Sequence, residues 1–178
     1  MGRLRFLANY IKNPSLVGSI TPTSRYVAER VIKMIPKDAK TIVEYGPGDG
    51  AVTIPLLNSL KKDCKLIVIE KNKNFAEELR KIKDKRLEVI EGDASDCEKY
   101  CKNPDVILSA LPFRAFPEQM REKILSSTAK NMKQECKFLI YLQYTNVLSK
   151  ELPKYFGKIE REHEWRNIPP TNIFICRK

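Results

Sequence analysis

The sequence has no apolar stretch that approaches the ~20 residues of a membrane-spanning helix, and its amino terminus lacks the apolar core of a signal peptide. We therefore expect a cytoplasmic protein, either free or peripheral at the inner face of the cell membrane. Acidic residues are also few, with 22 Asp and Glu against 33 Lys and Arg, which gives a formal net charge of +11. This excess suits an anionic membrane surface or RNA, so charge alone does not identify the partner.

Residues that bind transition metals are scarce. The chain has one histidine and five cysteines, and no two cysteines form a C-x-x-C pair. Cys97 and Cys101 lie one helical turn apart, but a single histidine does not complete a ligand set with them, and we expect no metal. Cys64 and Cys136 stand in apolar runs and are interpreted as small core residues of a reducing compartment.

The length and the hydrophobic pattern predict one α/β domain over residues 1–178. Hydrophobic residues make up 42% of the chain, enough for a single core. Apolar strand patterns alternate with amphipathic helix patterns, as a parallel or mostly parallel sheet requires. We expect strands near 41–45, 64–70, 87–91, 105–109, 137–144, 158–165 and 172–176. We expect helices near 4–13, 24–35, 51–61, 74–83 and 117–132.

Local signals refine this plan. Ser24 and Asn74 are predicted helix caps, and Pro117 suits a first helical turn. The last two strands are joined by a short link over 167–170, which predicts an antiparallel hairpin that closes the sheet.

Gly46, Gly48 and Gly50 form a glycine-rich turn after the first predicted strand, and Glu44 stands two residues before it. Glycines let the backbone approach a ligand closely, and the helix start after the turn offers free N–H groups. The next strand ends on Glu70, whose carboxylate can accept hydrogen bonds from both hydroxyls of a ribose. Together these residues predict a nucleoside-binding pocket.

The glycine spacing indicates which nucleoside. Dinucleotide-binding proteins use G-x-G-x-x-G and point a helix N-terminus at a pyrophosphate, whereas the pattern here is G-x-G-x-G. This form resembles motif I of the class I S-adenosylmethionine-dependent methyltransferases. The resemblance implies a Rossmann-like, seven-stranded, mostly parallel sheet, S-adenosylmethionine as cofactor, and Glu44 near its ammonium group. A glycine turn in an ordinary α/β domain is the alternative.

The same resemblance places further cofactor contacts at the ends of the next strands. Lys71 or Asn72 would flank the adenine, and Asp93 with Ala94 would read its edge. Open α/β sheets bind ligands at the carboxyl ends of their strands, which agrees with these positions. Alternatively, Asp93 is only a helix N-cap.

The fourth predicted strand ends in Ser109-Ala110-Leu111-Pro112-Phe113, a position that faces the sulfonium in this class. Ser109 would border the cofactor, and backbone carbonyls near Ser109 and Leu111 would hold the methyl-accepting group. Tyr141 would line the pocket. Alternatively, Leu-Pro-Phe is only an apolar loop that buries the end of the sheet.

The tip of the fourth strand also separates possible methyl acceptors. The adenine-N6 methyltransferases of ribosomal RNA carry Asn-Leu-Pro-Tyr here, in which the asparagine binds the exocyclic amine and the tyrosine stacks on the base. This chain has Ala110 in place of the asparagine, and the missing amide argues against adenine. An aliphatic amine needs only a carbonyl or two. Once methylated, its charge can sit against aromatic faces such as Phe113, Tyr141 or Tyr144.

The chain resembles the bacterial phospholipid N-methyltransferases, which convert phosphatidylethanolamine to its mono-, di- and trimethyl forms. The resemblance runs from about residue 6 to residue 176. Its most telling blocks are Asn-Pro with Val-Gly-Ser-Ile-Thr-Pro-Thr-Ser-Arg within 13–25, and Trp-Arg-Asn-Ile-Pro-Pro over 165–170. Asp49 departs from the threonine common in that family, and Ala110 departs from its glycine.

The amino-terminal segment 1–35 carries a basic amphipathic pattern. Its apolar residues recur at helical spacing, among basic ones: Leu4, Leu7, Tyr10 and Ile11, with Arg3, Arg5 and Lys12. We interpret this segment as a helical lid or membrane-contact segment before a core over 41–178. Alternatively, its helix covers the sheet of the domain itself. Candidate contacts to a lipid phosphate or a lid are Tyr10, Arg25, Tyr26 and Asn167.

We therefore expect a monomeric S-adenosylmethionine-dependent N-methyltransferase that acts on the amine headgroup of a phosphatidylethanolamine-like membrane phospholipid, in one or in successive methylations. Its partners would be an anionic membrane surface and an amine-bearing lipid. An rRNA adenine N6-methyltransferase, with nucleic acid as partner, is the first alternative. A peripheral lipid-binding module that keeps the fold without turnover is the second.

Overall fold

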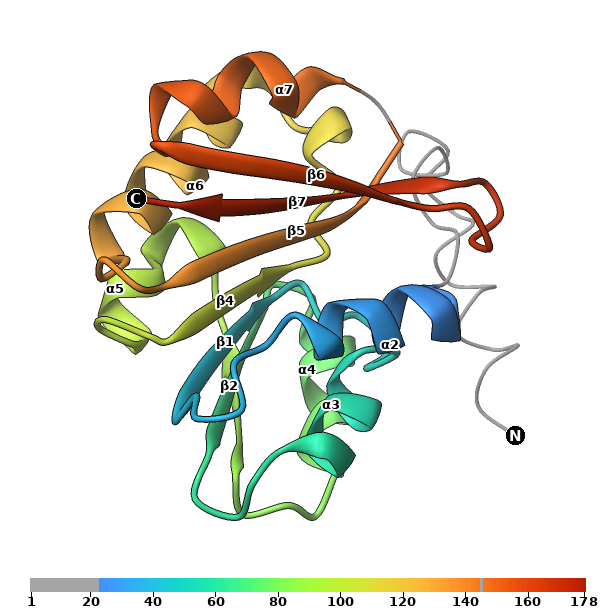
Figure 1. Cartoon of the computed structure of the whole chain (residues 1–178). Coiled ribbons are helices and arrows are strands. Elements are labelled where there is room, and N and C mark those ends of the chain that lie inside the picture. Colours follow the sequence, from blue (N-terminus) through green and yellow to red (C-terminus); the bar gives the residue numbers. More distant parts are fainter. Residues whose placement is uncertain (1–22, 145) are drawn as a thin grey trace.

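The computed structural model describes residues 23–144 and 146–178. One seven-stranded sheet runs through them in the order β3-β2-β1-β4-β5-β7-β6 (Figure 1). Its strands are β1 (Thr41–Tyr45), β2 (Lys65–Glu70), β3 (Leu87–Glu91), β4 (Val106–Ser109), β5 (Lys137–Gln143), β6 (Lys158–Glu164) and β7 (Thr171–Arg177). The strands β1 to β5 pair in parallel, and β7 is antiparallel to both β5 and β6. The predicted seven-stranded, mostly parallel sheet is confirmed.

Helices pack on both faces of this sheet (Figure 1). One face carries α2 (Arg25–Lys33), α3 (Thr53–Ser59) and α4 (Lys73–Arg80). The other face carries α5 (Cys97–Tyr100), α6 (Glu118–Asn131) and α7 (Val147–Glu151). Short 3-10 turns are η2 (Ala94–Asp96), η3 (Phe113–Ala115) and η4 (Leu152–Lys154).

The central strand β1 shows why the sequence folds this way. Successive side chains of a strand point to opposite faces, so Val43 and Tyr45 pack towards α6 while Ile42 and Glu44 face α2 and α3. Because helices cover both faces, all residues of β1 after Thr41 are buried. A parallel strand of this kind reads as a continuous apolar run, which is why the sequence locates it.

The predicted helix ends are partly right. Ser24 caps α2 as predicted, with its hydroxyl accepting from the backbone N–H of Val27. The prediction for Asn74 is wrong, because Asn72 caps α4 and accepts from the N–H groups of Asn74 and Phe75. Pro117 occupies the N-cap of α6 and not its first turn.

The predicted hairpin is confirmed, and its link lies at the functional edge of the sheet. β6 and β7 pair antiparallel and are joined by 165–170, with a cis peptide bond before Pro169. Because β7 runs against β5, β6 runs in the same direction as the parallel strands. The link therefore meets the carboxyl edge, which we define by the strand ends Tyr45, Glu70 and Ser109.

The helix expected near 4–13, with Tyr10, lies outside the described residues, as does most of the segment 1–35. Of that segment, the structure describes α2 and the residues next to it. Within the described ranges, none of the helices combines the length and the apolar character needed to cross a bilayer.

Candidate cofactor and acceptor site

The glycine turn after β1 forms the floor of the candidate site. Gly46, Gly48 and Gly50 have φ angles of +62°, +58° and +79°, in the left-handed region that favours glycine. A Cβ on Gly46 would lie 2.8 Å from Cδ2 of Leu111, so this turn packs directly under the tip of β4. A Cβ on Gly48 would meet nothing within 4 Å. The backbone is thus open to a ligand at Gly48.

Glu70 ends β2 beside this turn and is 7% exposed. One of its carboxylate oxygens accepts from the backbone N–H of Gly48 at 3.1 Å, and the other accepts from that of Asn72 at 2.8 Å. Burial raises the pKa of the Glu70 carboxyl, against the lowering effect of these N–H donors. Each oxygen keeps a second lone pair and can accept a further hydrogen bond, and the contact of Glu70 with a ribose stays a prediction.

Glu44 lies beneath the turn and is fully buried. Its carboxylate accepts from the hydroxyl of Thr53 at 2.7 Å and from that of Tyr141 at 3.1 Å. Burial raises the pKa of Glu44 to about 7; the two hydroxyls lower it in part, and the nearby Glu70 raises it further. Two buried carboxyl groups with raised pKa values beside one turn mark this part of the molecule as a candidate functional site.

Tyr141 has a different place from the one predicted. The sequence assigns it to the wall of the acceptor pocket, but its side chain is fully buried and its hydroxyl points at Glu44. It therefore supports the floor of the site and does not line the pocket. Thr53, the first residue of α3, does the same and is a residue that the sequence reasoning missed. Its position nine residues after Glu44, at the helix start that follows the turn, is the signal that could have found it.

Asp93 follows β3 and has two partners. One oxygen accepts from the N–H of Ser95 at 2.9 Å and caps η2, so Asp93 is a helix N-cap, whatever its further role. The other accepts from the ammonium of Lys71 at 2.9 Å. Partial burial raises the pKa of Asp93, but these hydrogen bonds outweigh it and hold the value at about 2. Asp93, Lys71 and the neighbouring Ala94 thus gather at the strand ends beside Glu70, where a role at the adenine stays a prediction.

The tip of β4 is built by a local hydrogen bond. The hydroxyl of Ser109, which is fully buried, accepts from the N–H of Leu111 at 3.3 Å. The N–H of Ala110 donates to the carbonyl of Tyr45, so the tip stays joined to β1 next to the glycine turn. Ser109 and Leu111 therefore lie where the sequence places them, beside the turn at the carboxyl edge.

Phe113 does not offer an aromatic face to an acceptor. Its side chain is fully buried in the core between the sheet and α6, and its ring lies 6.2 Å from that of Phe116. The expectation that Phe113 contacts a methylated amine is therefore wrong for this structure. For this residue the structure agrees with the alternative interpretation, in which the loop is apolar and buries the end of the sheet.

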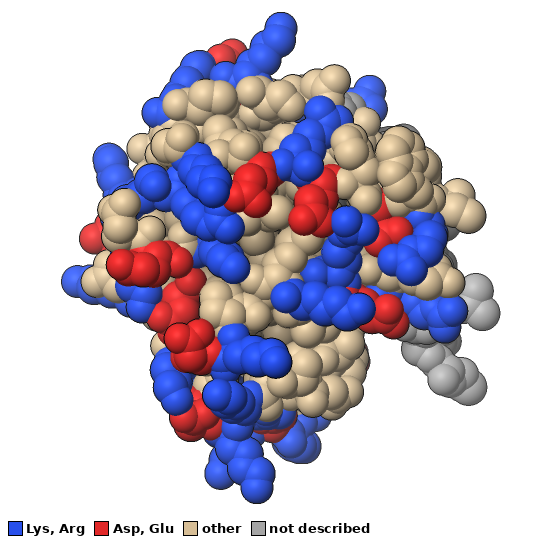
Figure 2. Space-filling model, in the orientation of Figure 1, with Lys and Arg blue, Asp and Glu red and all other residues tan. Residues whose placement is uncertain are grey.

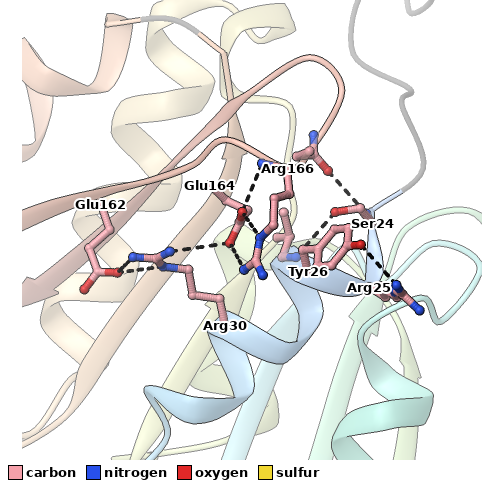
Figure 3. Close-up of polar contacts among 9 residues, drawn as sticks. Ser24, Arg25, Tyr26, Arg30, Glu162, Glu164 and Arg166 are labelled. Atoms are coloured by element: carbon pink, nitrogen blue, oxygen red, sulfur yellow. Dashed lines mark hydrogen bonds and ion pairs between the residues drawn. The ribbon is translucent and has the colours of Figure 1, made fainter.

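The remaining predicted acceptor contacts come together although they are far apart in the sequence. The side-chain carbonyl of Asn167 accepts from the N–H of Ser24 at 3.4 Å, and its amide donates to the hydroxyl of Tyr144 at 3.5 Å. Arg25 donates to the hydroxyl of Tyr26 at 3.0 Å (Figure 3). The start of α2, the end of β5 and the hairpin link thus form one cluster at the carboxyl edge.

A family model described as ribosomal RNA adenine dimethylase matches residues 1–153. The chain belongs to this family. Like its relatives, this methyltransferase has an α/β fold that binds S-adenosylmethionine, and it is an S-adenosylmethionine-dependent N-methyltransferase.

Two curated relatives point to different acceptors. The ornithine lipid N-methyltransferase of Singulisphaera acidiphila is 26% identical over 180 residues, which cover 97% of this chain and 94% of that protein. The probable ribosomal RNA small subunit methyltransferase A of Pyrobaculum aerophilum is 32% identical over 113 residues, 64% of this chain and 42% of that protein. The match to this second protein thus spans less than half of its length.

Solved structures share the fold. The precorrin-6Y C5,15-methyltransferase of Geobacter metallireducens superposes with a TM-score of 0.69 at 16% identity, covering 88% of this chain and 89% of that one. Magnesium protoporphyrin IX methyltransferase of Synechocystis, solved with S-adenosylmethionine bound, has a TM-score of 0.69 at 9% identity and covers 98% and 96%. These similarities establish the α/β architecture of the methyltransferases and leave the acceptor open.

The described residues fit this cofactor. The backbone is open above Gly48, the Glu70 carboxylate stands at the end of β2 beside it, and a second carboxylate, Glu44, is buried beneath the turn. Among the described residues, no three His, Cys, Asp or Glu side chains gather into a group that could hold a metal.

Proposed function

We propose that this enzyme methylates the amine headgroup of a membrane lipid, in one or in successive steps. Phosphatidylethanolamine and ornithine lipids both present such an amine. The end-to-end similarity to an ornithine lipid N-methyltransferase supports this class of acceptor.

The observation that carries the proposal is the tip of β4. Adenine recognition there would use an amide for the exocyclic amine and an aromatic ring for the base. Ala110 has no amide, and the ring of Phe113 is buried in the core. An aliphatic amine needs neither, since backbone carbonyls near Ser109 and Leu111 suffice to hold it.

The proposed roles follow from these positions. The glycine turn and Glu44 would hold the methionyl end of the cofactor, and Glu70 would hold the ribose. Lys71 or Asn72 would flank the adenine, and Asp93 with Ala94 would read its edge. The cofactor supplies an electrophilic methyl group when bound. The protein contributes mostly by position, because it holds a neutral amine in line with that methyl group and excludes water.

The test is incubation of the enzyme with labelled S-adenosylmethionine and a panel of lipids, read by mass spectrometry. The panel holds phosphatidylethanolamine, an ornithine lipid and, as a control, phosphatidylglycerol, which has no amine. We expect mass increments of whole methyl groups on at least one amine lipid and none on the control.

Ribosomal RNA is the second candidate acceptor, favoured by the family model and by the relatives named for the small ribosomal subunit. The same assay with ribosomal RNA as acceptor decides between them. Methylated adenine without any methylated lipid would overturn the proposal.

A further inference from the structure

The link between β6 and β7 exposes two large apolar side chains. Trp165 is 72% exposed and Ile168 is 84% exposed, whereas the next most exposed large apolar side chain among the described residues, Ile54, is 48% exposed. Exposed side chains of this size on one short link are unusual for a surface that meets only water. They indicate a contact surface.

This link is held in place from both sides. Asn167, between the two apolar residues, is buried and bonds the N–H of Ser24, the hydroxyl of Tyr144 and the carbonyl of Pro169. The ring of Trp165 stacks on that of His163, with centroids 5.3 Å apart. The apolar side chains are therefore presented from a fixed frame at the carboxyl edge, where an acceptor must enter.

Two arginines lie next to the apolar pair, Arg166 within the link and Arg25 at the start of α2. The guanidinium of Arg166 lies 4.5 Å from the centroid of the Tyr26 ring, and that of Arg25 lies 4.9 Å from it (Figure 3). Glu164 holds Arg166 at 2.9 Å, but Glu164 is 2% exposed while the side chain of Arg166 is 58% exposed. Arg30 is paired with Glu162 and Glu164, and Glu29 is the exposed acidic residue on this turn of α2. Of the charged groups next to Trp165 and Ile168, the most solvent-exposed ones are thus positive.

We propose that the link 165–170 is a membrane-docking loop for an anionic bilayer. Trp165 and Ile168 enter the boundary between headgroups and acyl chains, which tryptophan favours because its ring is both apolar and polar. Arg25 and Arg166 contact lipid phosphates beside them. The inference rests on the proposed function and deepens it, since a loop at this edge would bring the lipid amine to the tip of β4.

The chain offers a direct readout, because Trp165 is its one tryptophan. Tryptophan emission of the full chain is recorded with phosphatidylglycerol vesicles, with phosphatidylcholine vesicles and with an RNA oligonucleotide. We expect a blue shift and lower acrylamide quenching with phosphatidylglycerol, and a much smaller change with phosphatidylcholine. Emission that stays unchanged, whether or not the protein sediments with the vesicles, would overturn the proposal. So would a shift that RNA alone produces.

Variants separate the loop from the rest of the surface. The double variant Trp165→Ser, Ile168→Ser should lose at least about tenfold in affinity for phosphatidylglycerol vesicles by sedimentation. Trp165→Phe, which keeps an apolar ring, should retain most of it. Arg25→Gln should weaken binding more than Lys62→Gln, an equal change of charge on an exposed residue at the opposite edge. Full vesicle affinity in the double variant would refute the role of the loop.

The result is independent of catalysis. Phosphatidylglycerol carries no amine, so the fluorescence experiment tests membrane docking without any methyl transfer. It therefore gives an answer even if the enzyme methylates none of the lipids. The affinity of the double variant for S-adenosylmethionine, measured by calorimetry, should be unchanged. This result would show that the double variant keeps its fold. A double variant that lost cofactor affinity together with vesicle binding would contradict a loop that acts only at the membrane.

Discussion

At the scale of single residues, the two carboxylates under the glycine turn are the most informative. Glu44 and Glu70 are both buried, and burial raises the pKa of each. Protein donors satisfy both in part, since Glu44 has two hydroxyls and Glu70 has two backbone N–H groups. Such a pair is costly for stability and useful for a cationic nucleoside.

Glu70→Gln should raise the dissociation constant of S-adenosylmethionine at least about tenfold, because loss of a charged hydrogen-bonding partner costs about 1.5–3 kcal/mol. The new amide would also turn an N–H group towards the N–H of Gly48 or Asn72. Calorimetry measures the effect. Glu91→Gln is the matched control, since Glu91 pairs with Glu70 in the sheet, ends β3 and is exposed. If both variants bound S-adenosylmethionine with the same affinity, Glu70 would not be a cofactor contact.

Glu44 should make stability depend on pH. Its pKa rises from 4.5 to about 7 on folding, so between these values the folded chain binds more protons than the unfolded one. The free energy of unfolding should therefore fall as pH rises from 4.5 to about 7, by about 3 kcal/mol if this group acts alone. Urea titrations across this window should show the decline in the native chain and a flatter profile in Glu44→Gln. A parallel decline in both proteins would contradict the assignment.

Residue-scale prediction from the sequence succeeds where a residue type is tied to a backbone feature. The places of the three glycines in a left-handed turn and of Glu70 at the end of β2 are predicted correctly, while their contacts with the cofactor stay predictions. Phe113 and Tyr141 are misplaced because an aromatic residue near a site serves equally as core. The parity of β5 could have corrected Tyr141, since it shares a sheet face with Leu139 and faces α2 and α3.

At the scale of elements, the turn between β1 and α3 is the part of the fold that is most directly involved in the candidate site. Its glycines adopt left-handed φ angles, and it touches the tip of β4 through Leu111. Long parallel strands are predicted well because burial on both faces gives them continuous apolar runs. The short α5 and α7 are not predicted, since four and five residues hold too little of a helical period.

Gly48→Ala should separate folding from binding. Alanine in the left-handed region costs about 1–2 kcal/mol, and no protein atom within 4 Å adds a clash. We expect a small fall in thermal stability and a loss of at least about tenfold in cofactor affinity, because the new methyl group enters the space that a ligand would use. Gly46→Ala provides the comparison, since its Cβ would push against Leu111 and should lower stability more. Unchanged affinity in Gly48→Ala would place the cofactor elsewhere.

At the scale of the whole molecule, charge and topology act together. Basic side chains are spread over the face in Figure 2 and are interleaved with acidic ones, so the net charge of +11 is not gathered in one stripe on that face. Basic side chains spread in this way attract the protein to an anionic surface without favouring one face. Local features such as the hairpin link must then determine how the protein is oriented on that surface. The sequence predicted the charge and the edge, but not the exposure of Trp165 and Ile168, which depends on how the hairpin is anchored.

With the proposed lipid amine as acceptor, the reaction should accelerate towards alkaline pH, because only the neutral form of such an amine can accept the methyl group. A primary amine has a pKa near that of lysine, about 10.4, so the rate at saturating cofactor and short-chain lipid should rise about tenfold per pH unit from 7 to 9. Cofactor affinity over the same range serves as control. The adenine amino group does not titrate there, so a flat profile would argue for a nucleobase acceptor.

Because β7 runs antiparallel to β5, it ends at the edge of the sheet opposite to the glycine turn, and a label can be attached there. Cys176 pairs with Phe138, near the start of β5, whereas Asn172 pairs with Gln143 at its end. Lys178 consequently lies at the edge of the sheet opposite to the glycine turn, where its ammonium donates to the carbonyl of Met132. A fluorescent group or a surface-immobilisation handle attached at this edge would leave the glycine turn and the hairpin link unobstructed, which makes the edge suited to single-molecule or biosensor work on supported bilayers.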